Sequence, residues 1–170
     1  QSFEVESIGK GSATLVFSNQ YGVCFNPAGV EVVVSGSLIQ NPSFEDHPPS
    51  AAWPHYGAVG GWEGGSGVNN ASGPFQDNGV IPDRVQIAFT QGSRKLKQLV
   101  GGLEADQQYW LQFHYNVRNW GSGTSTMDLS IQFEEEELDY ISEIIPVGDG
   151  EPYYYHHIEF TPESSSGELV

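Results

Sequence analysis

The feature that most constrains the fold is an alternation of apolar and polar residues with a period of two. It recurs along the 170-residue chain and is clearest in residues 85–89, 110–115 and 127–133. Successive side chains of a β-strand point to opposite faces, so this pattern predicts half-buried strands. Clusters of Gly, Pro, Asn and Ser separate these stretches, and no amphipathic helix of four turns is indicated. The sequence therefore predicts an all-β fold, a jelly-roll β-sandwich.

Charge and composition narrow the classes of partner. The formal net charge is −16, from 22 acidic and 6 basic residues, and such a field repels nucleic acid and anionic membranes. No apolar run approaches the roughly 18 residues of a membrane span. The single cysteine, Cys24, excludes an internal disulfide framework and is expected to be a small buried side chain. A start at Gln1-Ser2 suits a mature terminus after signal cleavage, so we expect a secreted or cell-surface protein.

The two ends of the chain carry related strands. Residues 11–17 repeat the pattern of residues 165–170, and the chain stops where a sandwich is expected to continue. A sheet that lacks its last strands has an open edge, and open edges recruit strands. The expected organisation is N-terminal strands at 1–34, a short linker at 35–37 and a sandwich body at 38–170.

A succession of motifs in the body resembles a known family. In order they are Asn41-Pro42-Ser43-Phe44-Glu45, Gly61-Trp62, the strand at 85–91, Gly102-Leu103 and the strand at 109–113. This order is similar to that of the jelly-roll carbohydrate-binding modules and related galactose-binding-like domains of secreted bacterial proteins. The resemblance covers roughly residues 38–170. It implies the fold more specifically than the function, because such folds serve as lectins, adhesins and spacers alike.

The resemblance also implies which strands are displaced. In the family the domain closes with a Gly-x-Leu-x-Phe strand and a final strand that starts near a pair of aspartates. The matching elements here are residues 12–18 and 29–34, and Pro27-Ala28-Gly29 replaces the aspartate pair. Related modules hold a structural calcium between an early Glu and those late aspartates. Glu45 and Asp46 would supply half of such a site.

Three arrangements explain strands at the front of the chain. In the first, the N-terminal strands fold back into their own domain. In the second, they complete a neighbouring subunit. In the third, the chain is a fragment of a tandem array that is out of phase with its domains. The linker at 35–37 spans only about 10 Å when fully extended. Because the termini of jelly rolls lie close together, both folding back and donation remain open.

The leading hypothesis is a non-enzymatic subunit of an extracellular fibre or filament that assembles head to tail with copies of itself. Each chain would donate terminal strands to its neighbour, and such heterologous contacts build filaments unless the rotation closes a ring. The residues predicted for the strand-exchange interface are apolar and mostly alternate; they are Leu15, Phe17, Val23, Phe25, Val30, Val32 and Val34.

The alternative is a carbohydrate-binding module of a larger secreted protein. Exposed aromatic rings stack on the apolar faces of sugars, and polar neighbours bind the hydroxyl groups. The stacking candidates lie in or near glycine-rich loops: Trp53, Tyr56, Trp62 and Trp120, of which Trp62 is favoured as a core or loop anchor instead. The hydrogen-bonding candidates are Asn69, Asn70, Asp77, Asn78 and Arg118. The triplet Asn70-Ala71-Ser72 would also allow a glycan to be attached at Asn70.

We expect no catalytic activity, because no motif of a nucleophile, phosphate loop or zinc site is present. With 22 acidic residues, pairs of carboxylates carry no information about a glycosidase site. His156 and His157 are adjacent, so on a strand they point to opposite faces and cannot share a metal. The four carboxylates at 134–137 are favoured as a solvated strand end or hairpin tip over a metal site.

Overall fold

The computed structural model describes residues 11–15, 30–34, 37–46, 53–70, 79–119 and 126–170. The chain divides into two compact units, Gln1–Leu38 and Ile39–Val170. Among the described residues all named strands pair antiparallel, and the prediction of an all-β fold is confirmed. This part of the chain contains no helix of the length and apolarity needed to cross a membrane.

The described residues of the first unit include one pair of strands, β1 (Gly11–Leu15) and β2 (Val30–Val34). They run antiparallel, with Leu15 opposite Val30. Every residue of β2 except Glu31 is valine, whose branched side chain favours extended backbone. Four residues predicted for the exchange interface belong to these strands: Leu15, Val30, Val32 and Val34. The other three lie outside the described residues: Phe17, Val23 and Phe25.

The second unit contains a five-stranded antiparallel sheet in the order β10-β9-β12-β7-β4. Its strands are β4 (Glu63–Gly64), β7 (Leu96–Gly101), β9 (Met127–Phe133), β10 (Glu136–Ile144) and β12 (Ser166–Leu169). The strand β12 lies inside the sheet, because it pairs with β7 on one side and with β9 on the other. Val170 continues this pairing by exchanging two backbone hydrogen bonds of 2.9 Å with Gln132.

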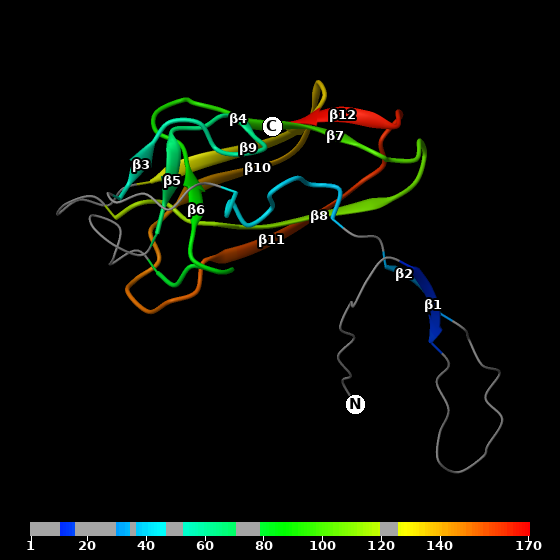
Figure 1. Ribbon diagram of the computed structural model, residues 1–170, viewed down its shortest axis with the longest axis horizontal. Helices are drawn as coiled ribbons and strands as arrows, with labels where there is room; N and C mark the ends of the chain where they lie inside the picture. Colours follow the sequence, from blue (N-terminus) through cyan, green and yellow to red (C-terminus); the bar gives the residue numbers. More distant parts are fainter. Residues whose placement is uncertain (1–10, 16–29, 35–36, 47–52, 71–78, 120–125) are drawn as a thin grey trace, which may run out of the picture. The chain divides into compact units, whose positions relative to one another are not determined.

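The described residues of this unit also form two smaller antiparallel sheets. One is the pair β8 (Tyr109–Tyr115) and β11 (Tyr154–Phe160), which are in register over their whole length. The other has the order β3-β5-β6, from β3 (His55–Tyr56), β5 (Gly67–Asn69) and β6 (Ile87–Phe89). Figure 1 shows β8 and β11 as a layer alongside β7, β9, β10 and β12. The body is therefore a β-sandwich with layers of unequal width.

The core lies between these layers and follows from the alternation in the strands. On β9, Ile131 and Phe133 are buried while the intervening Gln132 is more exposed. The ring of Phe133 lies 5.2 Å from that of Phe160 on β11, so the two layers are in direct contact. The buried apolar side chains are Val59, Val68, Val100, Leu103, Val117, Ile131, Phe133, Ile144, Val147, Ile158 and Leu169.

The acidic run at 134–137 forms the tip of the β9–β10 hairpin, one of the two solvated positions that its sequence predicts. Phe133 pairs with Glu136, and the intervening Glu134 and Glu135 make the turn. All four carboxylates are exposed to solvent. Glu134 has a second role, because its side chain accepts a hydrogen bond of 2.5 Å from the backbone nitrogen of Glu168 on β12.

A glycine in β12 makes room for the most deeply packed ring of the core. Gly167 is buried directly against Phe133, and a Cβ at this position would collide with the ring edge of Phe133. Gly101 lies next to it on β7, opposite Ser166, and a Cβ there would meet nothing within 4 Å. Both glycines lie in strands, but only at Gly167 would an added methyl group collide with a neighbour. Gly101 can therefore serve as the control that reports the cost of replacing a strand glycine without a collision.

We expect Gly167→Ala to lower the free energy of unfolding by about 1–3 kcal/mol, because a close-packed core must shift to admit the methyl group. Gly101→Ala is the matched control and should stay within about 0.5 kcal/mol of the parent. The measurement is the urea midpoint of each variant at constant m-value. Equal midpoints for the two variants would contradict the steric account.

Candidate functional site

The pair β8–β11 has two chemically different faces, because its strands alternate in register. Tyr109, Leu111, Phe113 and Tyr115 of β8 are half-buried and face the core, while the residues between them are exposed. On β11 the residues Tyr154, His156, Ile158 and Phe160 are less exposed than those between them. Residues paired across the strands share a face, so each face of the pair carries one continuous row from both strands.

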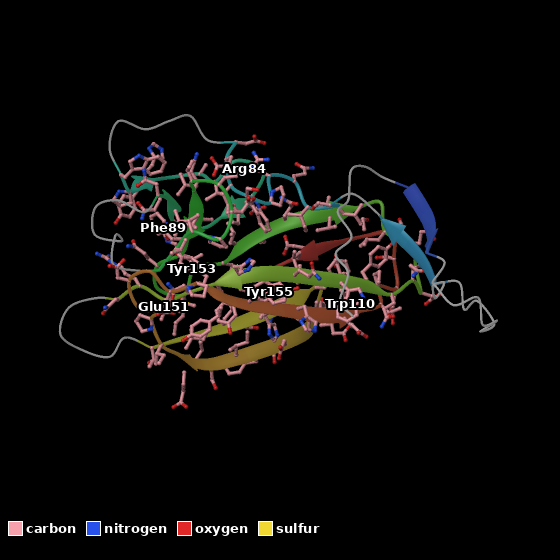
Figure 2. All side chains as sticks on the ribbon, turned by 90° about the horizontal axis from the view of Figure 1, so that it is seen from below. Arg84, Phe89, Trp110, Glu151, Tyr153 and Tyr155 are labelled. Carbon is pink, nitrogen blue, oxygen red and sulfur yellow. The ribbon has the colours of Figure 1, made fainter. Side chains whose placement is uncertain are left out.

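The outer face carries a row of exposed rings. Trp110 lies 5.3 Å from His157, and His114 lies 5.2 Å from Tyr155. Tyr155 and His157 are 6.0 Å apart, which joins the two contacts into one aromatic row. Trp110 is 53% exposed and Tyr155 is 52% exposed. Figure 2 labels both side chains along these strands. Rings with this exposure present apolar faces to solvent and can stack on the apolar face of a ligand.

The inner face of β8 carries no fully buried side chain. Its four inward side chains are all half-buried, whereas on β9 Met127 and Leu129 are half-buried and Ile131 and Phe133 are buried. Among the described residues, β8 pairs with β11 on one side and with no strand on the other. An edge strand leaves a row of backbone donors and acceptors without sheet partners. Among the described residues, β8 therefore combines an edge without a sheet partner with a row of half-buried inward side chains.

A hydrogen bond between the layers connects β10 to β11. The Nε2 atom of His156 lies 2.6 Å from Oδ2 of Asp139, and their side chains are 30% and 39% exposed. The ring of Phe113 meets His156 edge-on, with centroids 5.6 Å apart. His156 faces inward and His157 outward, as expected for adjacent residues of a strand. The pair therefore joins the two layers at the side where β10 and β11 end their sheets.

A bulge in β10 turns Asp139 toward this histidine. Pairing with β9 passes from Glu137 opposite Gln132 to Asp139 opposite Ile131, so Leu138 is an extra residue. Such an insertion re-aims the side chains that follow it. Asp139 consequently shares the inward face of Ile131.

The electrostatics follow from these contacts. The hydrogen bond from His156 lowers the pKa of Asp139 below its usual value, and the backbone N–H of Tyr140 adds to this effect. Burial raises the pKa of Tyr115, and the neighbouring Tyr154 and Asp139 raise it further. The charged form of Asp139 is thus favoured, while Tyr115 is held in its neutral form.

The aromatic residues predicted to stack on sugars have different surroundings. Trp62 packs 5.6 Å from Phe44, and its Nε1 donates a 3.3 Å hydrogen bond to the carbonyl oxygen of Asn41, which agrees with a loop anchor. Tyr56 is 57% exposed and meets Phe89 edge-on at 5.5 Å. Trp53 is half-buried, and Trp120 lies outside the described residues.

The residues predicted to bind sugar hydroxyl groups also lie in different surroundings. Asn69 is fully buried in β5, so its amide does not lie on the exposed surface. Asn70 and Arg118 are partly exposed. Asp77 and Asn78 lie outside the described residues. The structure therefore does not gather these residues with the predicted rings into one described surface.

The carboxylate that the resemblance assigns to calcium has amide partners. Glu45 Oε1 accepts hydrogen bonds from the backbone nitrogens of Val85 and Gln86, and Oε2 accepts one of 3.2 Å from the Gln86 side chain. Asp46 is exposed, and its backbone nitrogen bonds the Asn41 side chain. The described residues contain no group of three or more His, Cys, Asp or Glu placed to hold a metal. Structural calcium at Glu45 and Asp46 stays a prediction.

The residues of the outer row were not singled out from the sequence. The signal was present, because alternation in residues 109–115 and 154–160 requires one set of aromatic side chains to face outward. What the sequence lacks is the register, which places Trp110 near His157 and His114 opposite Tyr155. These contacts join segments more than forty residues apart and are set by tertiary folding.

We expect Asp139→Asn to lower stability above about pH 5 and to have little effect near pH 2. A carboxyl group whose pKa is lowered by folding contributes stability above its unfolded pKa of about 3.9, and that contribution is lost as the pH falls through the folded pKa. Urea midpoints between pH 2 and pH 7 measure the effect, with Asp149→Asn in an exposed loop as the control. Parallel curves for parent and Asp139→Asn would show that the bond to His156 adds nothing.

The chain was compared with protein-family models, with curated proteins and with solved structures, and none of them matches it. The resemblance to jelly-roll carbohydrate-binding modules therefore stays a prediction. The described geometry from which a function can be proposed is the two faces and the unpaired edge of the β8–β11 pair.

Proposed function

We propose that this protein is a structural subunit of an extracellular fibre that assembles head to tail. Each chain donates strands from its N-terminal unit, Gln1–Leu38, to the sandwich body, Ile39–Val170, of the next copy. The protein has no enzymatic role, its partners are copies of itself, and it acts outside the cell or at the cell surface. The net charge of −16 keeps single copies soluble and disfavours nucleic acid and anionic lipid as partners.

One observation carries this proposal: β8 is an edge strand with a half-covered apolar face. Its inward side chains from Tyr109 to Tyr115 are all half-buried, although they face the core of the sandwich. In the part of the chain that the structure describes, the sheet opposite has five strands, whereas β8 and β11 form a sheet of two. An added strand beside β8 would cover this row and extend the narrower layer.

Strand addition supplies affinity from two sources. Main-chain hydrogen bonds form along the acceptor edge, and alternate side chains enter the core. Each large apolar side chain contributes about 1.5–3 kcal/mol when it is fully buried. Three valines of β2 share one face by alternation, namely Val30, Val32 and Val34, while Glu31 and Val33 share the other. Glu31 is best placed in solvent, so the three valines form the face that enters the core.

We expect Val32→Asp to abolish filaments, or to raise the concentration needed for them by at least about tenfold, because it would bury a carboxylate in the interface. The matched control is Val33→Asp, which adds the same charge one residue away on the solvent face. Negative-stain electron microscopy and light scattering of the full chain at about 150 mM salt, where screening limits general repulsion, measure assembly.

The comparison of these two variants separates charge from position. Filaments in the parent and in Val33→Asp, together with monomers in Val32→Asp, are the expected result. Uniform monomers of the parent at high concentration would end the fibre proposal, because the N-terminal strands would then have no acceptor in another copy. Equal loss of assembly in both variants would attribute the effect to repulsion between acidic chains.

A second candidate function, glycan binding as a carbohydrate-binding module, is favoured by the exposed ring row of β8 and β11. Trp110 and Tyr155 are each about half exposed and stand in line with His114 and His157. Flat, exposed rings suit the apolar faces of a polysaccharide, and Gln112 and Glu159 on the same face can bind hydroxyl groups. A fibre subunit can carry such a surface on every copy.

If this second function holds, Trp110→Ala should reduce retention of the protein on an insoluble polysaccharide by at least about tenfold, because a stacking platform is lost. Leu99→Ala is the control, since Leu99 is 70% exposed on β7 and outside the ring row. Retention measured by pull-down on a panel of polysaccharides, with the oligomeric state monitored in parallel, gives the answer. Unchanged retention of Trp110→Ala on every polysaccharide would exclude the row as a sugar site.

A further inference from the structure

Resting on the proposed function, we infer which strand is donated and where it is accepted: β2 of one copy pairs with the free edge of β8 in the next. The strand β1 does not enter the acceptor sandwich at the position that its sequence matches. Three independent observations support this assignment. They concern the occupied position of β12, the charge of the available edges and the apolar pattern of β2.

The position that β1 resembles is already filled by the chain's own β12. Ser12, Leu15 and Val16 match Ser166, Leu169 and Val170 in spacing and identity. The strand β12 pairs with β7 from Ser166 opposite Gly101 to Leu169 opposite Gln98, and with β9 through Leu169 and Phe133. Both of its edges are therefore used inside one copy. A second strand of this type has no place beside it in the same sheet.

Sterics also exclude β1 from this position. Gly167 of β12 lies against the ring of Phe133, where a Cβ would collide with the ring edge. In the sequence match the residue of β1 that corresponds to Gly167 is Ala13. Exchange of β1 for β12 would thus bring a methyl group into the ring of Phe133, which is buried.

Charge selects among the remaining edges of the described sheets. The edge strand β10 carries Glu136, Glu137, Asp139 and Glu143, and β4 has only the two residues Glu63 and Gly64. The strand β11 carries Glu159. In contrast, β8 has seven residues without a carboxylate. The incoming β2 carries Glu31, and like charges paired across strands are destabilising. The outer edges β3 and β6 have two and three residues, too few for the five of β2.

The outward residues of β8 complement this charge. Trp110, Gln112 and His114 are exposed on the outer face, where Glu31 of an added strand would also lie. Gln112 and His114 can donate hydrogen bonds to a carboxylate. On the inner face, the valines of β2 meet the half-buried row of Leu111, Phe113 and Tyr115. Both faces of β2 therefore match both faces of β8.

Disulfide cross-linking in the full chain tests the assignment. Cys24→Ser removes the native thiol, and Val33→Cys places a new one on the solvent face of β2. A second cysteine is placed at an outward position of β8, in three separate variants, Trp110→Cys, Gln112→Cys and His114→Cys, to cover the register. Paired strand residues have Cα atoms about 4.5–5.5 Å apart, within the range of a disulfide. Controls combine Thr14→Cys in β1 with the same acceptors, and Val33→Cys with Tyr140→Cys in β10.

The expected result is a ladder of covalent oligomers on non-reducing gels for at least one pair of Val33→Cys with β8, at fivefold or greater yield than either control. Filaments in the Cys24→Ser parent without this ladder, or with a ladder from the β1 or β10 controls, would overturn the assignment and leave the fibre proposal standing. A disulfide confined to single chains would keep the β2–β8 match but overturn donation between copies. Neither filaments nor disulfides would end both proposals.

Discussion

The structure depends on the requirement that a strand facing a hydrophobic core must pair its backbone and cover its apolar side chains. In the sandwich body this requirement is met for β9 and β12, which lie inside a five-stranded sheet. It is met only on one side for β8, whose inward residues are half-buried. The two layers differ in the number of described strands, and this difference is the reason to propose that another strand is added at the edge of β8.

On the side of the sandwich away from the unpaired edge of β8, a polar contact joins the two layers. The bulge in β10 turns Asp139 inward, and His156 of β11 meets it across the layers at 2.6 Å. Both side chains remain partly exposed, so the desolvation cost of the pair stays modest. A hydrogen bond at this place holds the edge strands β10 and β11 together without burying a lone charge. The two sides of the sandwich thus differ, with one joined between the layers and the other open at β8.

The packing of β12 bears on stability and on the proposed assembly. Its Gly167 allows the ring of Phe133 to lie in the core, where Phe133 also contacts Phe160 of the other layer. The related strand β1 carries alanine at the equivalent position of the sequence match. A small difference in volume can therefore keep two similar strands in different roles, since a close-packed interior tolerates little change in shape.

The sequence by itself determined the all-β class, the strand character of residues 110–115 and 127–133, the opposite directions of His156 and His157, and the solvent exposure of the acidic run at 134–137. These features follow from a period of two and from turn residues, which are local. Only the tertiary structure decided the aromatic row from Trp110 to Tyr155, the pair Asp139–His156, the burial of Asn69 and the open edge of β8. Each of these depends on register between distant strands, a bulge or the number of strands in a sheet. Such long-range pairings leave no periodic signal in the chain.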